Sequence, residues 1–167
     1  MWFGHGPEEE IVMTEALILP EDPFHRRLHR IAPGGLTSET AQTSGMHRQA
    51  AISGASVHSS RLWMGQTTVA PATVSADHHH GASETAIYVV SGSPSFVFLD
   101  VEGDEPRETR IDARPGDFIY VPPFVPHREE NPDPDEEAVV VIARSTQEAI
   151  VVNLPALRWE GPDARGR

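Results

Sequence analysis

Short runs of apolar and β-branched residues alternate with turn-forming residues along most of the chain. The runs span residues 61–70, 85–91, 95–101, 117–121, 138–144 and 149–154. Glycine, proline, asparagine and aspartate gather between them, as in Gly92-Ser93-Pro94. Several short strands at this spacing, with frequent helix breakers, predict an all-β sandwich or barrel.

The first 60 residues have a looser pattern. Residues 11–19 form an apolar run that predicts a first strand, and residues 23–31 predict one short helix. Residues 33–60 are rich in serine, threonine, glycine and alanine, which predicts an extended arm with weak strands. We therefore predict three parts: an N-terminal tail, short strand, helix and arm over residues 1–60, a β domain over residues 61–155, and a polar C-terminal tail over residues 156–167.

Composition narrows the chemistry. The chain of 167 residues has no cysteine, and all 13 of its basic residues are arginine. Disulfide scaffolds, thiolate metal sites, thiol nucleophiles and lysine Schiff bases are therefore excluded. A formal net charge of −12 disfavours nucleic acid and anionic membranes as partners. The apolar runs are too short to span a bilayer and the N-terminus lacks a signal-peptide pattern, so we expect a soluble cytoplasmic protein.

Nine histidines occur, and three of them are consecutive: His78, His79 and His80. Because alternate residues of a strand share a face, the outer two point one way and His79 points the other. Glu84 lies four residues after His80, and His127 follows an apolar strand and a proline-stiffened turn that would fix its direction. Imidazoles on one face with a nearby carboxylate form a mixed nitrogen and oxygen ligand set for a metal ion.

The histidine triplet resembles the first of the two motifs of the cupin superfamily. That motif is written G-(x)5-H-x-H-(x)3–4-E-(x)6-G, and here it runs from Ala72 through His78, His80 and Glu84 to Gly92. Both histidines and the glutamate fit the motif. Ala72 stands in place of the first glycine, and the gap before Gly92 is one residue longer than in the motif.

The second cupin motif is written G-(x)5-P-x-G-(x)2-H-(x)3-N. It is matched from Gly116 through Pro122 and His127 to Asn131. Its single departure is Phe124, which stands in place of a glycine. The resemblance covers about residues 61–145, and the chain is similar to a small single-domain cupin that binds a metal.

The resemblance implies a cupin double-stranded β-helix, a jelly-roll-like barrel of two facing antiparallel sheets that carries the N-terminal arm. It also implies one divalent metal ion, Fe, Mn, Zn or Ni, inside the barrel. The ligands that it implies are His78, His80, Glu84 and His127.

The extra residue before Gly92 leaves an alternative for the fourth ligand. Counting back from Gly92 places Thr85, a poor ligand, at the carboxylate position. A β-bulge within residues 85–91 would absorb the extra residue and restore Glu84. We therefore predict a bulge in this strand and Glu84 as the ligand.

The cupin scaffold hosts many functions, so the fold alone implies no reaction. A retained ligand set favours a metal-dependent enzyme acting on a small organic molecule, which we predict to be a dioxygenase or another oxidoreductase. The alternatives are a redox-neutral isomerase or polyketide-type cyclase that uses zinc, and a non-catalytic cupin that binds a small ligand. Beyond the ligands, no catalytic residue is assigned.

Aromatic residues of the β domain are the candidates for the walls of a substrate pocket. They are Trp63, Tyr88, Tyr120 and Phe124. The resemblance further implies that two chains pair into a homodimer, for which the long polar arm before residue 61 would be available.

Overall fold

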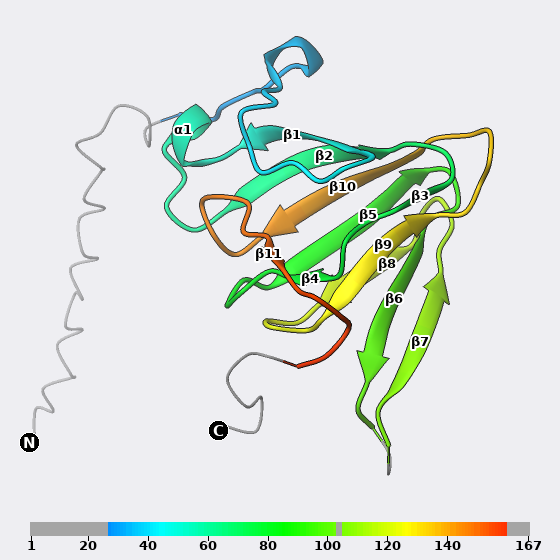
Figure 1. Ribbon diagram of the computed structural model, residues 1–167. Coiled ribbons are helices and arrows are strands. Elements are labelled where there is room, and N and C mark those ends of the chain that lie inside the picture. Colours follow the sequence, from blue (N-terminus) through cyan, green and yellow to red (C-terminus); the bar gives the residue numbers. More distant parts are fainter. Residues whose placement is uncertain (1–26, 103–104, 160–167) are drawn as a thin grey trace, which may run out of the picture.

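Two antiparallel sheets make up the body of the protein (Figure 1). The computed structural model describes residues 27–102 and 105–159. One sheet is built from β1 (Met46–Ile52), β2 (Trp63–Val69), β5 (Thr85–Ser91), β8 (Phe118–Val121) and β10 (Ala138–Arg144). The other is built from β3 (Thr73–Val74), β4 (His78–His79), β6 (Ser95–Asp100), β7 (Arg107–Asp112), β9 (His127–Asn131) and β11 (Val152–Asn153). Helical structure in the described residues consists of a 3₁₀ turn at Pro33–Gly35 and the single-turn helix α1 (Gly54–Val57).

Strands that are distant in the sequence lie side by side in both sheets. The order is β1–β2–β10–β5–β8 in the five-stranded sheet and β11–β4–β9–β6–β7 in the other, with β3 paired to β9. The chain therefore crosses repeatedly from one sheet to the other, as in a jelly roll. The predicted all-β fold class is confirmed.

Alternation along the central strands builds the core. Every second residue of β2 and β10 is buried, beginning with Trp63 and Ala138. The fully buried Trp63 belongs to one apolar cluster with Ile87 and Ile142 from the same sheet and Phe96 from the other. Each such side chain contributes about 1.5–3 kcal/mol when it is fully buried, so this cluster holds the two sheets together.

Apolar patterning predicts some strands and misses others. The predicted runs at residues 85–91 and 138–144 coincide with β5 and β10. Neither β7 nor β9 is predicted, because neither has an apolar pattern. β7 is largely exposed, and β9 has the sequence His-Arg-Glu-Glu-Asn with four of its five residues buried. Polar residues on a buried strand such as β9 give no hydrophobic periodicity, so the sequence pattern does not reveal that the strand is buried.

Part of the predicted arm is joined to the barrel, because β1 pairs with β2 along its whole length. The division of the chain at residue 60 stays a prediction. The predicted helix over residues 23–31 is absent from its described part, residues 27–31, which lack regular structure. The predicted strand at 11–19 and residues 160–167 of the polar tail lie outside the described residues. No helix in the described ranges has the length and hydropathy needed to cross a bilayer.

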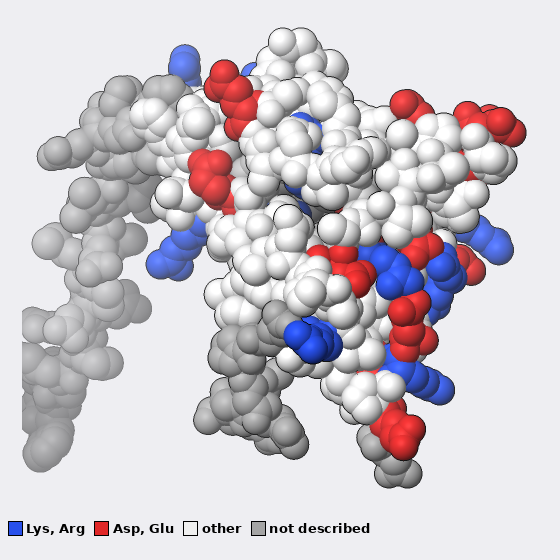
Figure 2. All heavy atoms as spheres, viewed as in Figure 1, with Lys and Arg blue, Asp and Glu red and all other residues white. Residues whose placement is uncertain are grey.

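Charged side chains of both signs gather over β7 and β9 on the face shown in Figure 2. Arg128 forms ion pairs with Glu130 at 2.7 Å and Glu108 at 2.5 Å, and Arg110 forms one with Glu130 at 2.6 Å. Glu108 and Arg110 are exposed, whereas Arg128 is partly buried and Glu130 is buried. Pairs that involve the exposed groups contribute little each. We interpret this network as a polar outer face and not as a binding site.

Both residues that stand in place of motif glycines have a left-handed backbone. Ala72 has φ of 49° and Phe124 has φ of 61°. This conformation costs an L-residue roughly 1–2 kcal/mol, whereas glycine adopts it freely. The structure thus explains why the cupin motif has glycine at these two positions.

Ala72→Gly is therefore expected to stabilise the protein by roughly 0.5–1 kcal/mol, because the strain that it relieves exceeds glycine's extra chain entropy. The shift of the urea midpoint at constant slope measures this change. Ala70→Gly is the matched control, since Ala70 is outside the left-handed region, and that variant is expected to be less stable. An Ala72→Gly protein no more stable than the Ala70→Gly protein would contradict the prediction.

Candidate metal centre

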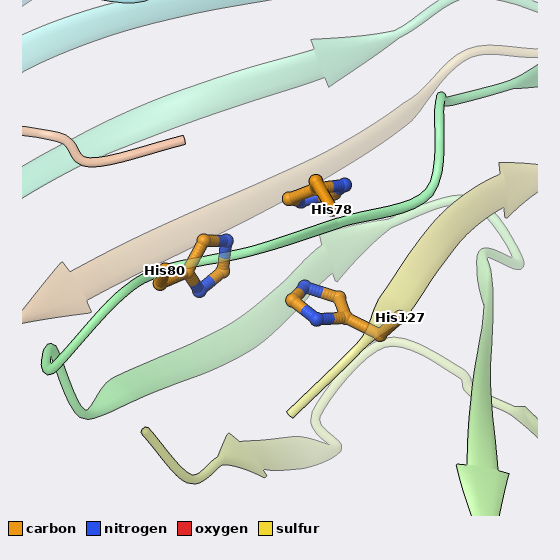
Figure 3. A group of neighbouring side chains, drawn as sticks. All are labelled: His78, His80 and His127. Carbon is orange, nitrogen blue, oxygen red and sulfur yellow. The ribbon is translucent and has the colours of Figure 1, made fainter. Parts of the chain in front are cut away.

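Three buried histidines converge in the interior of the barrel (Figure 3). His78 begins β4, His80 follows its end, and His127 begins β9, where it pairs with His78. Their ring centroids are 4.4 Å (His78 to His127), 4.6 Å (His80 to His127) and 5.2 Å (His78 to His80) apart. One ring nitrogen from each of the three lies within 4.8 Å of the others, which suits a shared metal ion. The structure thus brings together three of the four predicted ligands.

Backbone carbonyls fix the orientation of two of these rings. Nδ1 of His78 lies 2.9 Å from the carbonyl oxygen of Ala76, and Nδ1 of His127 lies 2.9 Å from that of Val125. Because a carbonyl only accepts, each Nδ1 carries the proton and each Nε2 keeps a lone pair. Both Nε2 atoms are buried and have no hydrogen-bond partner among the described residues. A protonated Nδ1 held by the backbone with a free Nε2 is the arrangement of a metal-binding histidine.

His80 is held by two side chains instead. Its Nε2 accepts a hydrogen bond from Nη2 of Arg144 at 3.0 Å. Because arginine can only donate, Nδ1 carries the proton and donates to the hydroxyl of Thr85 at 2.8 Å. All three imidazoles therefore have the same tautomer, and a metal ion that uses Nε2 of His80 must displace Arg144.

Burial keeps these imidazoles uncharged at neutral pH. It lowers the pKa of His127 from 6.5 to about 4 and also lowers the pKa of His78, because a buried charge loses its hydration. The pKa of His80 falls well below 6.5, first through burial and then through the charge of Arg144. Neutral imidazole is the form that binds metal ions, so the site is prepared for a metal at pH 7.

Glu84 is not brought to the histidines. It is exposed, and its Oε1 accepts a hydrogen bond from the hydroxyl of Tyr120 at 2.9 Å. Alternation along β5 turns Thr85, which is fully buried, toward the interior in its place. The predicted bulge is present, since Val89 and Ser91 pair with consecutive residues of β10. The bulge lies near the end of β5, after the inward-facing residues that begin at Thr85. It therefore does not turn the Glu84 carboxylate toward the interior. Glu84 as a ligand stays a prediction that this placement does not support.

A cavity of about 400 Å³ has His127 among its lining residues. Its walls are mainly apolar and come from β6, β8 and the turn before β9, with Trp159 from the C-terminal segment. Phe96, Phe98, Ile119, Val121 and Val125 are among the apolar wall residues. Sequence patterning assigns such residues to the core, and only the topology shows that they border an open space. A cavity of this size suits a small organic molecule.

Of the four aromatic residues predicted to line a pocket, Tyr120 borders this cavity. Trp63 lies in the core, with the guanidinium of Arg144 5.7 Å from the centroid of its ring. Tyr88 is exposed and lies beside Phe118, with ring centroids 4.8 Å apart. Phe124 contacts His79, the middle histidine of the triplet. His79 is buried, although strand alternation places it on the face opposite to His78 and His80.

The barrel interior also holds two buried arginines and a buried glutamate that the sequence analysis does not identify. Arg48 and Arg144 are each 1% exposed, and Glu129 is 3% exposed. Burial lowers the pKa of Arg144 to about 10, so its guanidinium remains charged at neutral pH. No sequence signal identifies these three residues, because charged residues are rarely buried and they belong to three different strands, β1, β10 and β9.

Comparison with known proteins agrees with this architecture. Residues 65–143 match the cupin domain family, whereas no curated protein sequence matches the chain. A structure of oxalate decarboxylase aligns with a TM-score of 0.59 at 23% identity over 70% of this chain and 30% of that one. The oxalate decarboxylase of Bacillus subtilis, described with Mn(II) centres, aligns with a TM-score of 0.59 at 21% identity over the same shares.

Recombinant oxalate oxidase in complex with glycolate aligns with a TM-score of 0.58 at 19% identity, over 70% of this chain and 60% of that one. The chain thus spans less than a third of the decarboxylases and 60% of the oxidase. At these identities the likeness concerns the fold. Residues 65–143 form a cupin domain.

Proposed function

We propose that this protein is a metal-dependent cupin enzyme that acts on a small organic molecule, with one divalent metal ion held by His78, His80 and His127. The observation that carries the proposal is the pair of buried, unpartnered Nε2 atoms on His78 and His127. A buried polar atom without a partner costs about 1–3 kcal/mol, and a metal ion at this point would satisfy both atoms. The neutral imidazole donors suit Fe, Zn or Ni, whereas Mn, the other metal that the motif resemblance implies, favours oxygen donors.

The site offers three protein ligands and lies next to a cavity. This arrangement favours a catalytic metal site over a purely structural one. Structural sites are closed by four protein ligands, whereas catalytic sites keep positions open. Here His127 borders both the histidine cluster and the cavity, so a molecule in the cavity would lie beside the metal. When bound, Fe or Mn would supply oxygen or electron-transfer chemistry, and Zn would supply Lewis-acid polarisation. The apolar walls would orient the molecule and exclude water.

We favour a dioxygenase or another oxidoreductase. Support comes from the fold likeness to oxalate oxidase and to a decarboxylase with Mn(II) centres, which is an analogy at the level of the fold. The second candidate, a redox-neutral isomerase or cyclase that uses zinc, is favoured by Glu129. Its Oε2 is buried without a hydrogen-bond partner among the described residues, and its charge acts on His78, so it could serve as a base for a molecule that reaches the metal position. The homodimer stays a prediction.

Metal loading followed by an activity screen tests these proposals. Chelator-treated protein is loaded anaerobically with Fe(II), Mn(II) or Zn(II), and the metal per chain is measured. Each form is then incubated with a panel of small aromatic and aliphatic acids, with and without oxygen. His127→Ala, treated identically, is the control and is expected to be inactive in every form.

Oxygen uptake that requires Fe or Mn together with one panel compound would support the oxidoreductase. Conversion of a compound by the Zn form without oxygen would support the isomerase or cyclase instead. Retention of metal with no conversion would favour the non-catalytic ligand-binding cupin. Failure to retain any of the three metals would contradict the metal site.

A further inference from the structure

Arg48 and Arg144, the two buried arginines, are in ion-pair contact with no carboxylate of the described residues. The described residues contain no ion pair between Arg48 or Arg144 and an acidic group. Arg48 donates to the carbonyl of Ala41, and Arg144 donates through Nη1 to the carbonyl of Ile150 at 2.7 Å. The Nε atoms of both arginines are buried without a partner. Burying a charge is costly unless it is paired, so two guanidinium groups in this interior need a compensating anion.

Metal binding would release one of these donors. Nη2 of Arg144 now points at Nε2 of His80, the lone pair that a metal ion would take. Once that acceptor is taken, Nη2 is left beside the metal without a partner, and buried donors nearly always have one. An anion bound to the metal would supply an acceptor at this place, and charge-assisted hydrogen bonds from arginine to a carboxylate are strong.

The ligand set leaves the positive charge uncompensated as well. Thr85 occupies the inward position that the cupin motif gives to glutamate, so the three remaining donors are neutral imidazoles. A divalent ion and two guanidinium groups would then face at most the single negative charge of Glu129. Charges of one sign confined in a low-dielectric interior repel strongly, and an anionic ligand would lower this energy.

We infer that the ligand of this site is an apolar organic carboxylate, whose carboxylate lies between the metal position and Arg144 and whose hydrocarbon part fills the cavity. The apolar cavity accounts for the preference for a hydrocarbon part. Phe96, Phe98 and Val125 line it, and His127 connects it to the histidine cluster. The inference rests on the proposed metal site and narrows its substrate class. In it, Arg144 is a binding residue that distinguishes a carboxylate from a neutral molecule of the same shape.

A matched pair of probes tests the inference. The protein is loaded with Co(II), whose visible absorption reports changes at the metal, and titrated with 3-phenylpropanoate or with the neutral 3-phenylpropanamide. The carboxylate is expected to bind at least about tenfold more tightly than the amide, in line with a hydrogen bond between charged groups. Arg144→Gln is expected to remove this preference by weakening the carboxylate alone.

Two further variants separate binding from folding. Arg144→Lys keeps the charge but not the forked donors, so it should retain a reduced preference for the carboxylate even where Arg144→Gln does not fold. Arg114→Gln removes the same charge from an exposed position and should bind both probes as the wild type does. Melting temperature and Co(II) content are measured for every variant.

The failure of each proposal gives a different result. If the wild type holds Co(II) but binds both probes equally, or binds neither, the inference is overturned while the metal site stands. An unchanged preference in Arg144→Gln would overturn the role of this arginine. If the wild type holds no Co(II), the metal site itself is wrong and the carboxylate inference falls with it.

Discussion

His127→Ala is expected to lose most of the bound metal, and His78→Ala and His80→Ala are expected to do the same. Each substitution removes one of three convergent Nε2 donors and leaves an incomplete site. Loss of a residue that merely orients a ligand already costs about 10–100-fold in affinity, and loss of the ligand itself should cost more. Metal per chain after anaerobic loading and gel filtration measures the effect.

The neighbouring residues provide matched controls. His79→Ala should retain the metal, because Nδ1 of His79 accepts a hydrogen bond from the backbone of Gly81 and the ring lies against Phe124. Glu84→Ala should also retain it, since the carboxylate is exposed and bonded to a tyrosine. Thr85→Val keeps the shape but removes the oxygen that orients His80, so affinity should fall by about 10–100-fold.

Metal contents opposite to these expectations would show which ligand assignment is wrong. If Glu84→Ala loses the metal and Thr85→Val keeps it, β5 must turn Glu84 inward when the metal binds, and the motif's glutamate is a ligand after all. If His79→Ala empties the site and His78→Ala does not, the alternation of β4 is misassigned and with it the histidine set.

Much of this site could be predicted because its signals are local. The spacing of His78 and His80 gives two side chains on one face of a strand, and the prolines before His127 give a rigid entry into β9. The placement of Glu84 could also have been inferred from alternation. Ile87 and Val89 are apolar and face the core, so the residue two before Ile87 faces the same way, and that residue is Thr85. The motif allows either spacing, and the pleat of the strand decides between them.

The interior charges could not be predicted, because they depend on contacts between distant parts of the chain. Arg48 and Arg144 look like ordinary polar residues within strands, and only the order of the sheet brings β1 and β10 to the same barrel. β9 shows the same limit, since its buried polar residues carry no hydrophobic pattern. Patterning identifies apolar cores well, and it identifies a polar interior only where a motif marks it.

Acid is expected to destabilise the metal-free protein from about pH 6.5 downward, before most carboxylates titrate. In the folded state burial lowers the pKa of His127 to about 4, whereas in the unfolded chain it returns to about 6.5. Below pH 6.5 the unfolded chain therefore binds a proton that the folded protein does not, so stability falls with pH until about pH 4. The difference of about 2.5 pKa units corresponds to roughly 3 kcal/mol for this residue.

The pKa shifts of other buried groups separate the histidine range, pH 6.5 to 4.5, from the range below pH 4.5 in which carboxylates take up protons. The lowered pKa values of His78 and His80 add to the loss in the same range. Burial alone would raise the pKa of Glu130, but its hydrogen bonds with Arg128 and Arg110 lower it below its usual 4.5. The stabilisation from that carboxylate is present above pH 4.5 and is lost only as the pH falls below that value. Loss of stability between pH 6.5 and 4.5 is therefore assigned to His78, His80 and His127 and not to Glu130.

Urea unfolding of the metal-free protein between pH 4 and pH 8 measures this dependence. His127→Gln cannot take up the proton in either state, so its stability should fall less steeply between pH 6.5 and 4.5 than that of the wild type. His58→Gln is the matched control at an exposed histidine and should follow the wild type. Because protons and metal compete for the same Nε2 atoms, metal-loaded wild type should also lose its extra stability as the pH falls through this range. Equal slopes for wild type and His127→Gln would show that His127 is not buried as a neutral imidazole, and the preparation of this site for a metal would have to be abandoned.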